Sequence, residues 1–192
     1  MLTFKQSKSG LMVALLLPDH LSRYIFSKVQ DAPFTSKYKI IQPGDHHITL
    51  LYFKDGEINI ELLDGILKEF SYDLQGYYTY FFLDGIGKFD KSEDAEDAIF
   101  IPVYNGSPDY GIIAFQQELC VRIGFALNVR YDLLFRYSKY TPHVTVAYIP
   151  SELEYDYIEE LSDIFVGTYI STETFSLING KERKDYKFNN VL

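Results

Sequence analysis

The sequence predicts an α+β fold of two similar halves that share a cleft. One six-residue pattern occurs twice, as HITLLY at residues 47–52 and as HVTVAY at residues 143–148. Around each copy, strand-like runs alternate with segments of helical periodicity. The chain has no Pro/Gly/Ser-rich linker. We therefore expect residues 1–192 to form a single domain of two pseudo-symmetric lobes.

The elements of the first half follow from apolar periodicity. Residues 12–17 are a continuous apolar run, which predicts a central strand. Residues 18–30 carry apolar side chains at helical spacing after a Pro-Asp start. A Pro-Gly-Asp turn at 43–45 then leads into a strand over 47–53. Helical spacing returns from about residue 60 to residue 70.

The second half repeats this alternation. Residues 77–83 and 98–104 are aromatic and β-branched, which predicts two strands joined by a solvated acidic loop at 90–97. An amphipathic helix follows the turn at 105–108 and is expected to end near Gly124, with Ser107 or Asp109 as its cap. Further along we expect a strand from residue 143 to Pro150, a helix over about 153–165, a strand over 169–178 and a polar tail.

Composition narrows the possible partners and location. The formal net charge is -9 and the pI about 4.9, which argues against binding along a long nucleic-acid duplex. The apolar run near the N-terminus is much shorter than the roughly 20 residues needed to span a bilayer, so no membrane segment is expected. With one cysteine, Cys120, no internal disulfide can form. These features predict a cytoplasmic protein.

The two histidine motifs are the main candidates for a functional site. Alternate side chains of a strand share a face, so His47 lies beside Thr49 and His143 beside Thr145. The same alternation places Tyr52 and Tyr148, as well as His46, on the opposite face. We expect the tyrosines to pack under helices and His46 to lie on the outer face or at the strand edge. His20, at a helix start, is expected on the surface.

Other chemistries fit the sequence poorly. No His-Glu-x-x-His or Cys-x-x-Cys pattern is present, so no metal site is expected. The segment Gly85 to Lys88 lacks the spacing of a phosphate-binding loop. No Gly-x-Ser-x-Gly elbow occurs, and Cys120 falls on the apolar face of its helix, where a buried and inert thiol is expected.

The paired His-x-Thr motifs, one in each half, resemble those of the 2H phosphoesterase superfamily. This superfamily includes 2′,5′ RNA ligases, RNA cyclic phosphodiesterases and viral enzymes that destroy cyclic-nucleotide alarm signals. Residues 10–15, 83–89 and 140–143 resemble the family's first strand, its mid-chain strand and the approach to its second motif. The likeness extends from about residue 10 to residue 178. It implies a two-lobed pseudo-twofold fold with antiparallel sheets around a central cleft, helices outside, and no required metal or other cofactor. The chain departs from the family pattern in its aromatic, acidic character and in the loop near Asp90.

The residue types then suggest a mechanism. One neutral and one protonated imidazole can act as general base and general acid near neutral pH. Hydroxyl groups such as those of Thr49 and Thr145 can donate hydrogen bonds to phosphoryl oxygens. We expect a metal-independent phosphodiesterase that cleaves small cyclic or 2′-5′-linked oligonucleotides. Pseudo-symmetry leaves the choice of base and acid open.

Substrate-binding residues are expected around these motifs. Tyr140 is the candidate for stacking on a base, and Arg136 and Lys88, with Lys54 as a further cation, are candidates for contacting a second phosphate. Two alternative functions are processing of RNA ends with a 2′,3′-cyclic phosphate, as in the RNA ligase-like members, and sequestration of nucleotides without cleavage. If a virus encodes the chain, the host cytoplasm is the expected location.

Overall fold

The computed structural model describes residues 11–31, 39–53, 58–74, 79–89, 96–105, 111–128, 140–150 and 156–187. Within these ranges the chain forms ten strands and four helices. In chain order they are β1 (Leu11–Leu16), α1 (Asp19–Gln30), β2 (Lys39–Ile40), β3 (His47–Phe53), α2 (Ile60–Asp73), β4 (Thr79–Leu83), β5 (Gly87–Phe89), β6 (Glu96–Asn105), α3 (Ile112–Leu127), β7 (His143–Pro150), α4 (Asp156–Phe165), β8 (Thr168–Thr172), β9 (Thr174–Asn179) and β10 (Glu182–Lys187).

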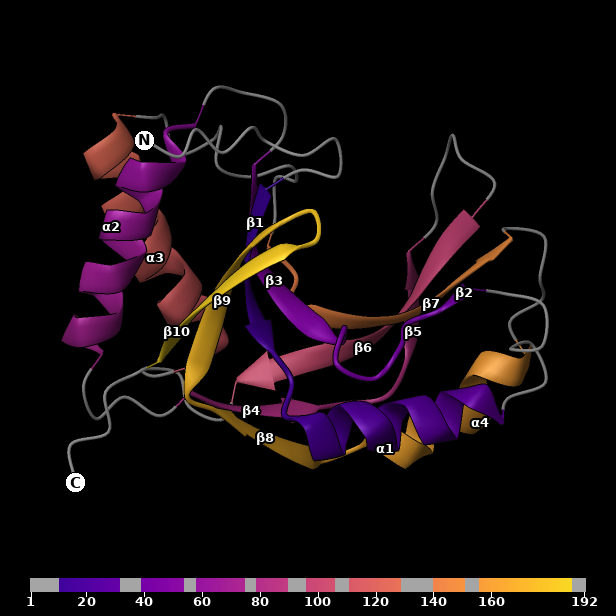
Figure 1. The fold of residues 1–192 in the computed structure, drawn as a ribbon. Helices are drawn as coiled ribbons and strands as arrows, with labels where there is room; N and C mark the ends of the chain where they lie inside the picture. The colour runs from indigo at the N-terminus through magenta and orange to yellow at the C-terminus, as the bar shows by residue number, and fades with distance from the viewer. Residues whose placement is uncertain are drawn as a thin grey trace.

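The strands form a curled antiparallel sheet with helices on its outer side (Figure 1). The main strand order is β10-β9-β1-β3-β7-β6-β4-β8, while β2 pairs with β7 and β5 pairs with β6. Helices α2 and α3 pack together and contact β10, β3, β6 and β4, whereas α1 and α4 pack together and α1 contacts β2 and β7. The predicted α+β architecture, with antiparallel sheets and outer helices, is confirmed.

The C-terminal part of the sheet differs from the prediction. The single strand expected over residues 169–178 is two strands, β8 and β9, separated at Glu173. β8 pairs with β4 at one edge of the sheet, and β9 pairs with β1. The expected polar tail contains β10, which pairs with β9. Its sequence ERKDYK carries one apolar side chain, as suits an edge strand that faces water, so apolar alternation gave no signal for it.

Two helices end later than their periodicity predicted. Helix α3 continues past Gly124 to Leu127 and ends at Asn128, whose left-handed φ of 50° breaks the helix. Its N-cap is Gly111, which makes no side-chain cap bond, and the predicted caps Ser107 and Asp109 lie outside the described residues. Helix α2 starts as expected, where the Asn59 side chain accepts a hydrogen bond from the Leu62 amide, and runs to Asp73.

Aromatic side chains from three elements meet in the core under α2 and α3. The rings of Phe70 and Phe115 lie 5.2 Å apart, and Phe175 of β9 lies 5.9 Å from Phe70, all in edge-to-face geometry. Each ring is almost fully buried, and such burial contributes about 2 kcal/mol per side chain. Cys120 is buried as predicted, and burial raises the pKa of its thiol to about 12. No helix of the described ranges is long and apolar enough to cross a bilayer.

Candidate active site

The two motif strands are neighbours at the middle of the sheet. β3 and β7 are antiparallel, with Ile48 directly opposite Val144. In an antiparallel pair this register puts His47 opposite Thr145 and Thr49 opposite His143. Ile48 and Val144 are fully buried on the helix side, while the four motif side chains are half-buried on the other side. We call these four residues the His–Thr quartet and the surface that carries them the quartet face.

Each motif strand contains a β-bulge at the same position. The pairing of β1 with β3 leaves Leu50 as an extra residue, and the pairing of β6 with β7 leaves Val146 as an extra residue. Both residues directly follow the motif threonine. Burial along residues 47–53 then matches burial along residues 143–149 position by position. The pseudo-twofold symmetry therefore extends from the motif sequence to the backbone.

The bulges correct the prediction for Tyr52 and Tyr148. An extra residue reverses the alternation of side chains, so both tyrosines lie on the quartet face and not opposite to it. Tyr52 is paired with Met12, which shares a face with Ala14, the partner of Thr49. Tyr148 is half-buried, and the Lys39 ammonium lies 5.5 Å from the centre of its ring. Both tyrosines therefore border the quartet.

Backbone carbonyls fix the orientation of both motif histidines. His47 Nδ1 lies 2.8 Å from the Asp45 carbonyl oxygen, and His143 Nδ1 lies 2.7 Å from the Thr141 carbonyl oxygen. A carbonyl can only accept, so in each ring Nδ1 carries the proton and donates. Each Nε2 is therefore the nitrogen that can exchange a proton with a substrate.

The environment of His143 favours its neutral form. Burial is the largest effect and lowers the pKa of His143, the hydrogen bond to Thr141 raises it, and the nearby His47 lowers it again. The net direction is downward. The effect of His47 on this pKa indicates that the two imidazoles are close enough to influence each other electrostatically.

His46 has a different position from the one predicted. It does point away from the quartet, but it is only 1% exposed, because α1 covers it. Its Nδ1 lies 2.8 Å from Ser22 Oγ of α1, and the same oxygen accepts a hydrogen bond from the Gly44 amide at 2.8 Å. Gly44 has a φ of 91°, which favours glycine. The contacts hold the turn that carries the Asp45 carbonyl. His20 is exposed, as predicted.

Tyr140 connects the two motif strands. Its hydroxyl donates to the Thr49 carbonyl oxygen at 3.1 Å. Burial raises the pKa of the Tyr140 phenol, so the group remains a donor. This hydrogen bond links the segment that precedes the second motif to Thr49, the residue directly before the bulge of the first motif strand.

The structure does not bring Lys88 to the quartet. Lys88 pairs with Ile99, which is fully buried on the helix side of the sheet. Its ammonium lies 2.9 Å from the Asp97 carboxylate, and the two side chains are 9% and 2% exposed. The expected phosphate contact does not fit this placement. Asp97, expected in a solvated loop, belongs to β6. Arg136, Lys54 and residues 90–95 lie outside the described residues.

Two phenylalanines that the sequence analysis did not single out contact His143. The ring centres of Phe89 and Phe100 lie 4.8 Å and 5.4 Å from the imidazole centre, in edge-to-face geometry. Both alternate with helix-side residues along β5 and β6, so their sequence pattern is that of ordinary strand residues. Knowledge of the register was needed to place them beside the motif.

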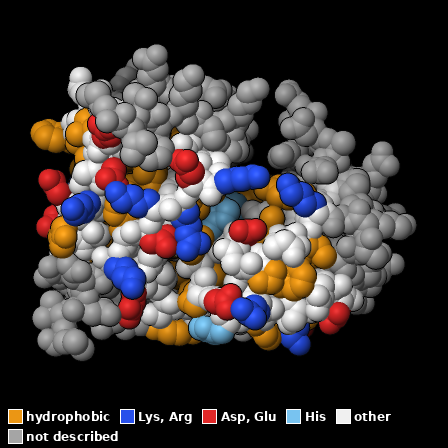
Figure 2. All heavy atoms as spheres, viewed as in Figure 1, with side chains coloured by type: hydrophobic (Ala, Val, Ile, Leu, Met, Phe, Trp, Pro, Cys, Tyr) orange, Lys and Arg blue, Asp and Glu red, His pale blue; other side chains and the backbone are white. Residues whose placement is uncertain are grey.

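Cations also lie on the quartet face despite the acidic composition. Arg183 pairs with Ile178, Ile178 with Met12, and Met12 with Tyr52. Directly paired side chains lie on the same face of a sheet, so Arg183 shares the face of Tyr52. Lys39 lies opposite Tyr148 at the other end. In the space-filling view, both Lys and Arg side chains and Asp and Glu side chains border a histidine near the middle of the molecule (Figure 2).

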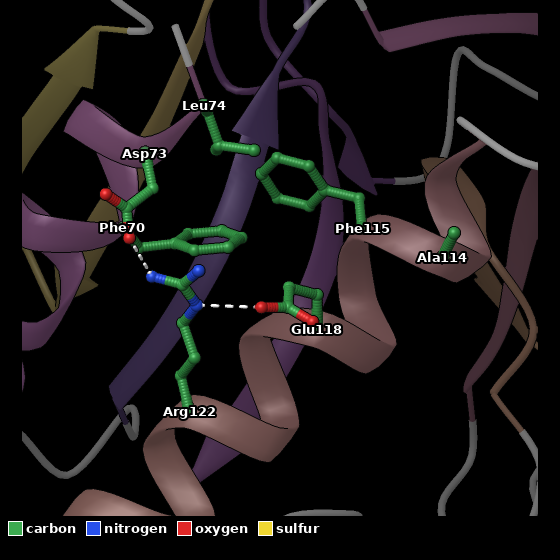
Figure 3. A pocket seen from close by; sticks show the side chains of 7 residues that line it. All are labelled: Phe70, Asp73, Leu74, Ala114, Phe115, Glu118 and Arg122. Carbon is green, nitrogen blue, oxygen red and sulfur yellow. Dashed lines mark hydrogen bonds and ion pairs between the residues drawn. The ribbon is translucent and has the colours of Figure 1, made fainter.

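A separate pocket of about 320 Å³ lies between α2 and α3 (Figure 3). Its apolar wall includes Phe70 and Phe115, and Arg122 reaches across it to the carboxylates of Asp73 and Glu118. None of the quartet residues lines this pocket, so its chemistry is separate from that of the motifs.

Comparison of the sequence finds no match to a family model and no match to a curated protein. Solved structures do match along almost the whole chain. The protein TT0787 of Thermus thermophilus superposes with a TM-score of 0.68 at 16% identity, over 95% of this chain and 100% of that chain. The chain has the fold of the 2H phosphoesterases.

Two further structures share this 2H fold. Escherichia coli LigT complexed with ATP matches with a TM-score of 0.60 at 15% identity, over 94% of this chain and 95% of that one. Usb1 of Kluyveromyces marxianus with uridine monophosphate matches with a TM-score of 0.52 at 10% identity, over 92% and 97% of the two chains. LigT has also been solved with 3′-AMP, with phosphate and with NADP+.

Proposed function

We propose that this protein is a 2H-type phosphodiesterase that cleaves small cyclic or 2′-5′-linked oligonucleotides without a metal ion. The observation that carries the proposal is the quartet: two imidazoles oriented through Nδ1 and two threonine hydroxyls on one face of two antiparallel strands. Proteins of the same fold bind mononucleotides and phosphate, as the LigT and Usb1 complexes show for those proteins.

The quartet can perform both proton transfers of phosphodiester cleavage. One neutral imidazole accepts the proton of the attacking hydroxyl, from water or a ribose 2′-OH, as its oxygen bonds to phosphorus. The other imidazole, protonated, donates to the departing oxygen as the second P–O bond breaks. Residues diagonal across an antiparallel pair lie roughly 7–8 Å apart, so His47 and His143 can flank one phosphorus atom. Thr49 and Thr145 donate hydrogen bonds to its non-bridging oxygens.

We assign the base to His143 and the acid to His47. A base must be neutral before the reaction begins, and burial lowers the pKa of His143. The assignment predicts a bell-shaped pH dependence of kcat/KM, whose acidic limb reports His143. In the reverse direction the two roles exchange.

Charge supports a short substrate. The chain has a formal net charge of -9, so a long polyanion is repelled overall. Lys39 on the quartet face nevertheless provides a local cation for a further phosphate, while Arg183 on the same face is paired with Asp185. A cyclic di- or trinucleotide matches this distribution better than a long RNA.

The decisive experiment measures cleavage by the full chain with and without excess EDTA. The panel contains cyclic di- and trinucleotides, 2′-5′-linked oligonucleotides and RNA ends with a 2′,3′-cyclic phosphate, with products resolved by chromatography. His47→Ala and His143→Ala are each expected to lower kcat by at least roughly 10²-fold. His20→Ala, which changes an exposed histidine far from the motifs in the chain, is the matched control.

Each outcome decides between functions. Cleavage by the wild type and by His20→Ala alone supports the proposal and identifies the substrate. Turnover of RNA ends alone replaces it with RNA end processing. Tight binding without turnover replaces it with sequestration, and activity abolished by EDTA but restored by a divalent metal overturns the metal-independent mechanism.

A further inference from the structure

The surroundings of the two motif histidines break the pseudo-twofold symmetry. β1 flanks β3 as β6 flanks β7, and both pairings contain the same bulge. The residue of β1 opposite Thr49 is Ala14, while the equivalent residue of β6, opposite Thr145, is Phe100. An aromatic ring therefore lies beside the second motif at the position where a methyl group lies beside the first.

A second ring joins Phe100 against His143. Phe89 stacks on Phe100 with ring centres 3.9 Å apart and planes at 17°. The imidazole meets the rings of Phe89 and Phe100 at 76° and 68° respectively. Together with the hydrogen bond from Nδ1 to the Thr141 carbonyl, these contacts restrict both side-chain torsions of His143.

Gly87 makes room for this arrangement. It lies directly opposite Phe100, and a Cβ added to it would come within 2.7 Å of the Phe100 Cζ and 3.0 Å of its Cε2. Such distances are shorter than van der Waals contact, so any larger residue at this position must displace the Phe100 ring. The glycine is required here by space and not by its backbone conformation.

We propose that Gly87, Phe89 and Phe100 form an aromatic clamp that positions the His143 imidazole for proton transfer and shields it from water. The clamp rests on the proposed function, because it assigns a purpose to the asymmetry between two catalytic histidines. Its three members are positioning residues. They act on His143 and need not touch the substrate.

The charges around His143 make the effect of the clamp measurable. From β3, His47 faces it as a titratable group and Thr49 as an uncharged one. The residues that face it from β5 and β6 are the uncharged Phe89, Phe100 and Pro102. His47 lowers the pKa of His143, but burial lowers it more. Opening the clamp admits water and reduces the burial effect, so the pKa of His143 must rise toward its ordinary value.

The test compares Gly87→Ala, Phe100→Leu and Phe89→Leu with wild type. Imidazole titrations are followed by NMR on the full chain, and kcat and KM are measured against pH where cleavage is detected. In each variant we expect the pKa of His143 to rise and the acidic limb of the pH profile to move by the same amount. We also expect kcat to fall roughly tenfold, with KM within about twofold of wild type, because the reacting nitrogen is misplaced.

Gly65→Ala is the matched control. Gly65 lies within α2, and an added Cβ there meets no atom within 4 Å. The His143 titration should be unchanged in this variant. Phe89 is half-buried, so Phe89→Leu keeps a folded variant in the set even if Gly87→Ala unfolds.

The two proposals fail in different ways. An unchanged His143 titration in folded Phe89→Leu and Phe100→Leu overturns the clamp, whatever the activity. A shifted titration supports the clamp. If the titration shifts but wild type cleaves nothing in the substrate panel, the proposed function fails, and the three residues remain only as packing that shields the imidazole from water.

Discussion

Single backbone atoms decide the chemistry that the motif histidines can perform. The carbonyls of Asp45 and Thr141 each hold an Nδ1–H, which leaves Nε2 of His47 and His143 as the reactive nitrogens. In the segment that leads into β3, the carbonyl of His46, which follows Asp45, is also fixed. It accepts a hydrogen bond from the Leu17 amide at 3.1 Å. Because main-chain atoms orient the rings, side-chain substitutions in the approach segments can preserve the tautomer as long as they preserve the turn.

Tyr140 provides a test at this scale, because its hydroxyl has a structural partner. Tyr140→Phe removes the hydrogen bond to the Thr49 carbonyl and leaves that acceptor without the donor. We expect a loss of about 1–2 kcal/mol in the free energy of unfolding, measured by urea denaturation. KM should stay within about twofold of wild type, since Phe retains the ring. A large rise in KM without loss of stability would instead indicate that the tyrosine binds substrate through its hydroxyl.

At the scale of elements, the two β-bulges determine which side chains surround the quartet. Without Leu50 and Val146 as extra residues, Tyr52 and Tyr148 would lie on the helix side. A bulge has no clear sequence signal, because Leu and Val are ordinary strand residues. Period-2 alternation therefore predicted the strands and the pairing of His with Thr, but not the residues beyond the threonines.

The same limit explains the other differences from prediction. The helices and the central strands are indicated by long apolar periodicity, and their order suffices for the fold. β2 has two residues and β5 has three, too few for any pattern, although they bring Lys39 and Phe89 to the quartet face. His46 was misplaced because its partner Ser22 is distant in sequence. Lys88 was misplaced because its partner Asp97 was assigned to a loop.

The Lys88–Asp97 ion pair joins β5 to β6 on the helix side, and its burial makes a prediction at the scale of elements. Asp97→Asn removes the carboxylate charge that lies 2.9 Å from this buried ammonium. We expect it to destabilise the fold by about 3 kcal/mol or more in thermal and urea unfolding. The double variant Lys88→Met/Asp97→Leu should recover most of this loss and keep KM near that of wild type. A rise in KM in the stable double variant would restore Lys88 as a substrate-binding residue.

At the scale of the whole molecule, the two lobes are interleaved along the chain. β1 pairs with β3 and β9, but the helix that follows it, α1, packs against β2 and β7 in the other half of the sheet. The C-terminal strands β9 and β10 return to extend the first lobe. A cut between the two motifs would therefore leave neither lobe complete, which supports the expectation of a single cooperative domain.

The folding stability of this architecture depends on pH through His46, which lies between α1 and the turn that precedes β3. Burial, together with the neighbouring His47, lowers the pKa of His46 to about 4, against the opposing effect of Asp45. The unfolded chain binds this proton at about pH 6.5, so between pH 6.5 and pH 4 it holds more protons at this site than the folded chain.

Folding stability must therefore fall as the pH decreases through this window. The contribution of His46 is fully present above about pH 6.5, and by pH 4 roughly 3 kcal/mol of it is lost. Urea unfolding at several pH values measures the effect, and His46→Asn, which retains a polar side chain toward Ser22, isolates it from the titration of the acidic surface. The stability difference between wild type and His46→Asn should change by that amount between pH 7 and pH 4. A difference that is independent of pH would mean that the buried histidine takes up its proton without opening the contact between α1 and the turn before β3.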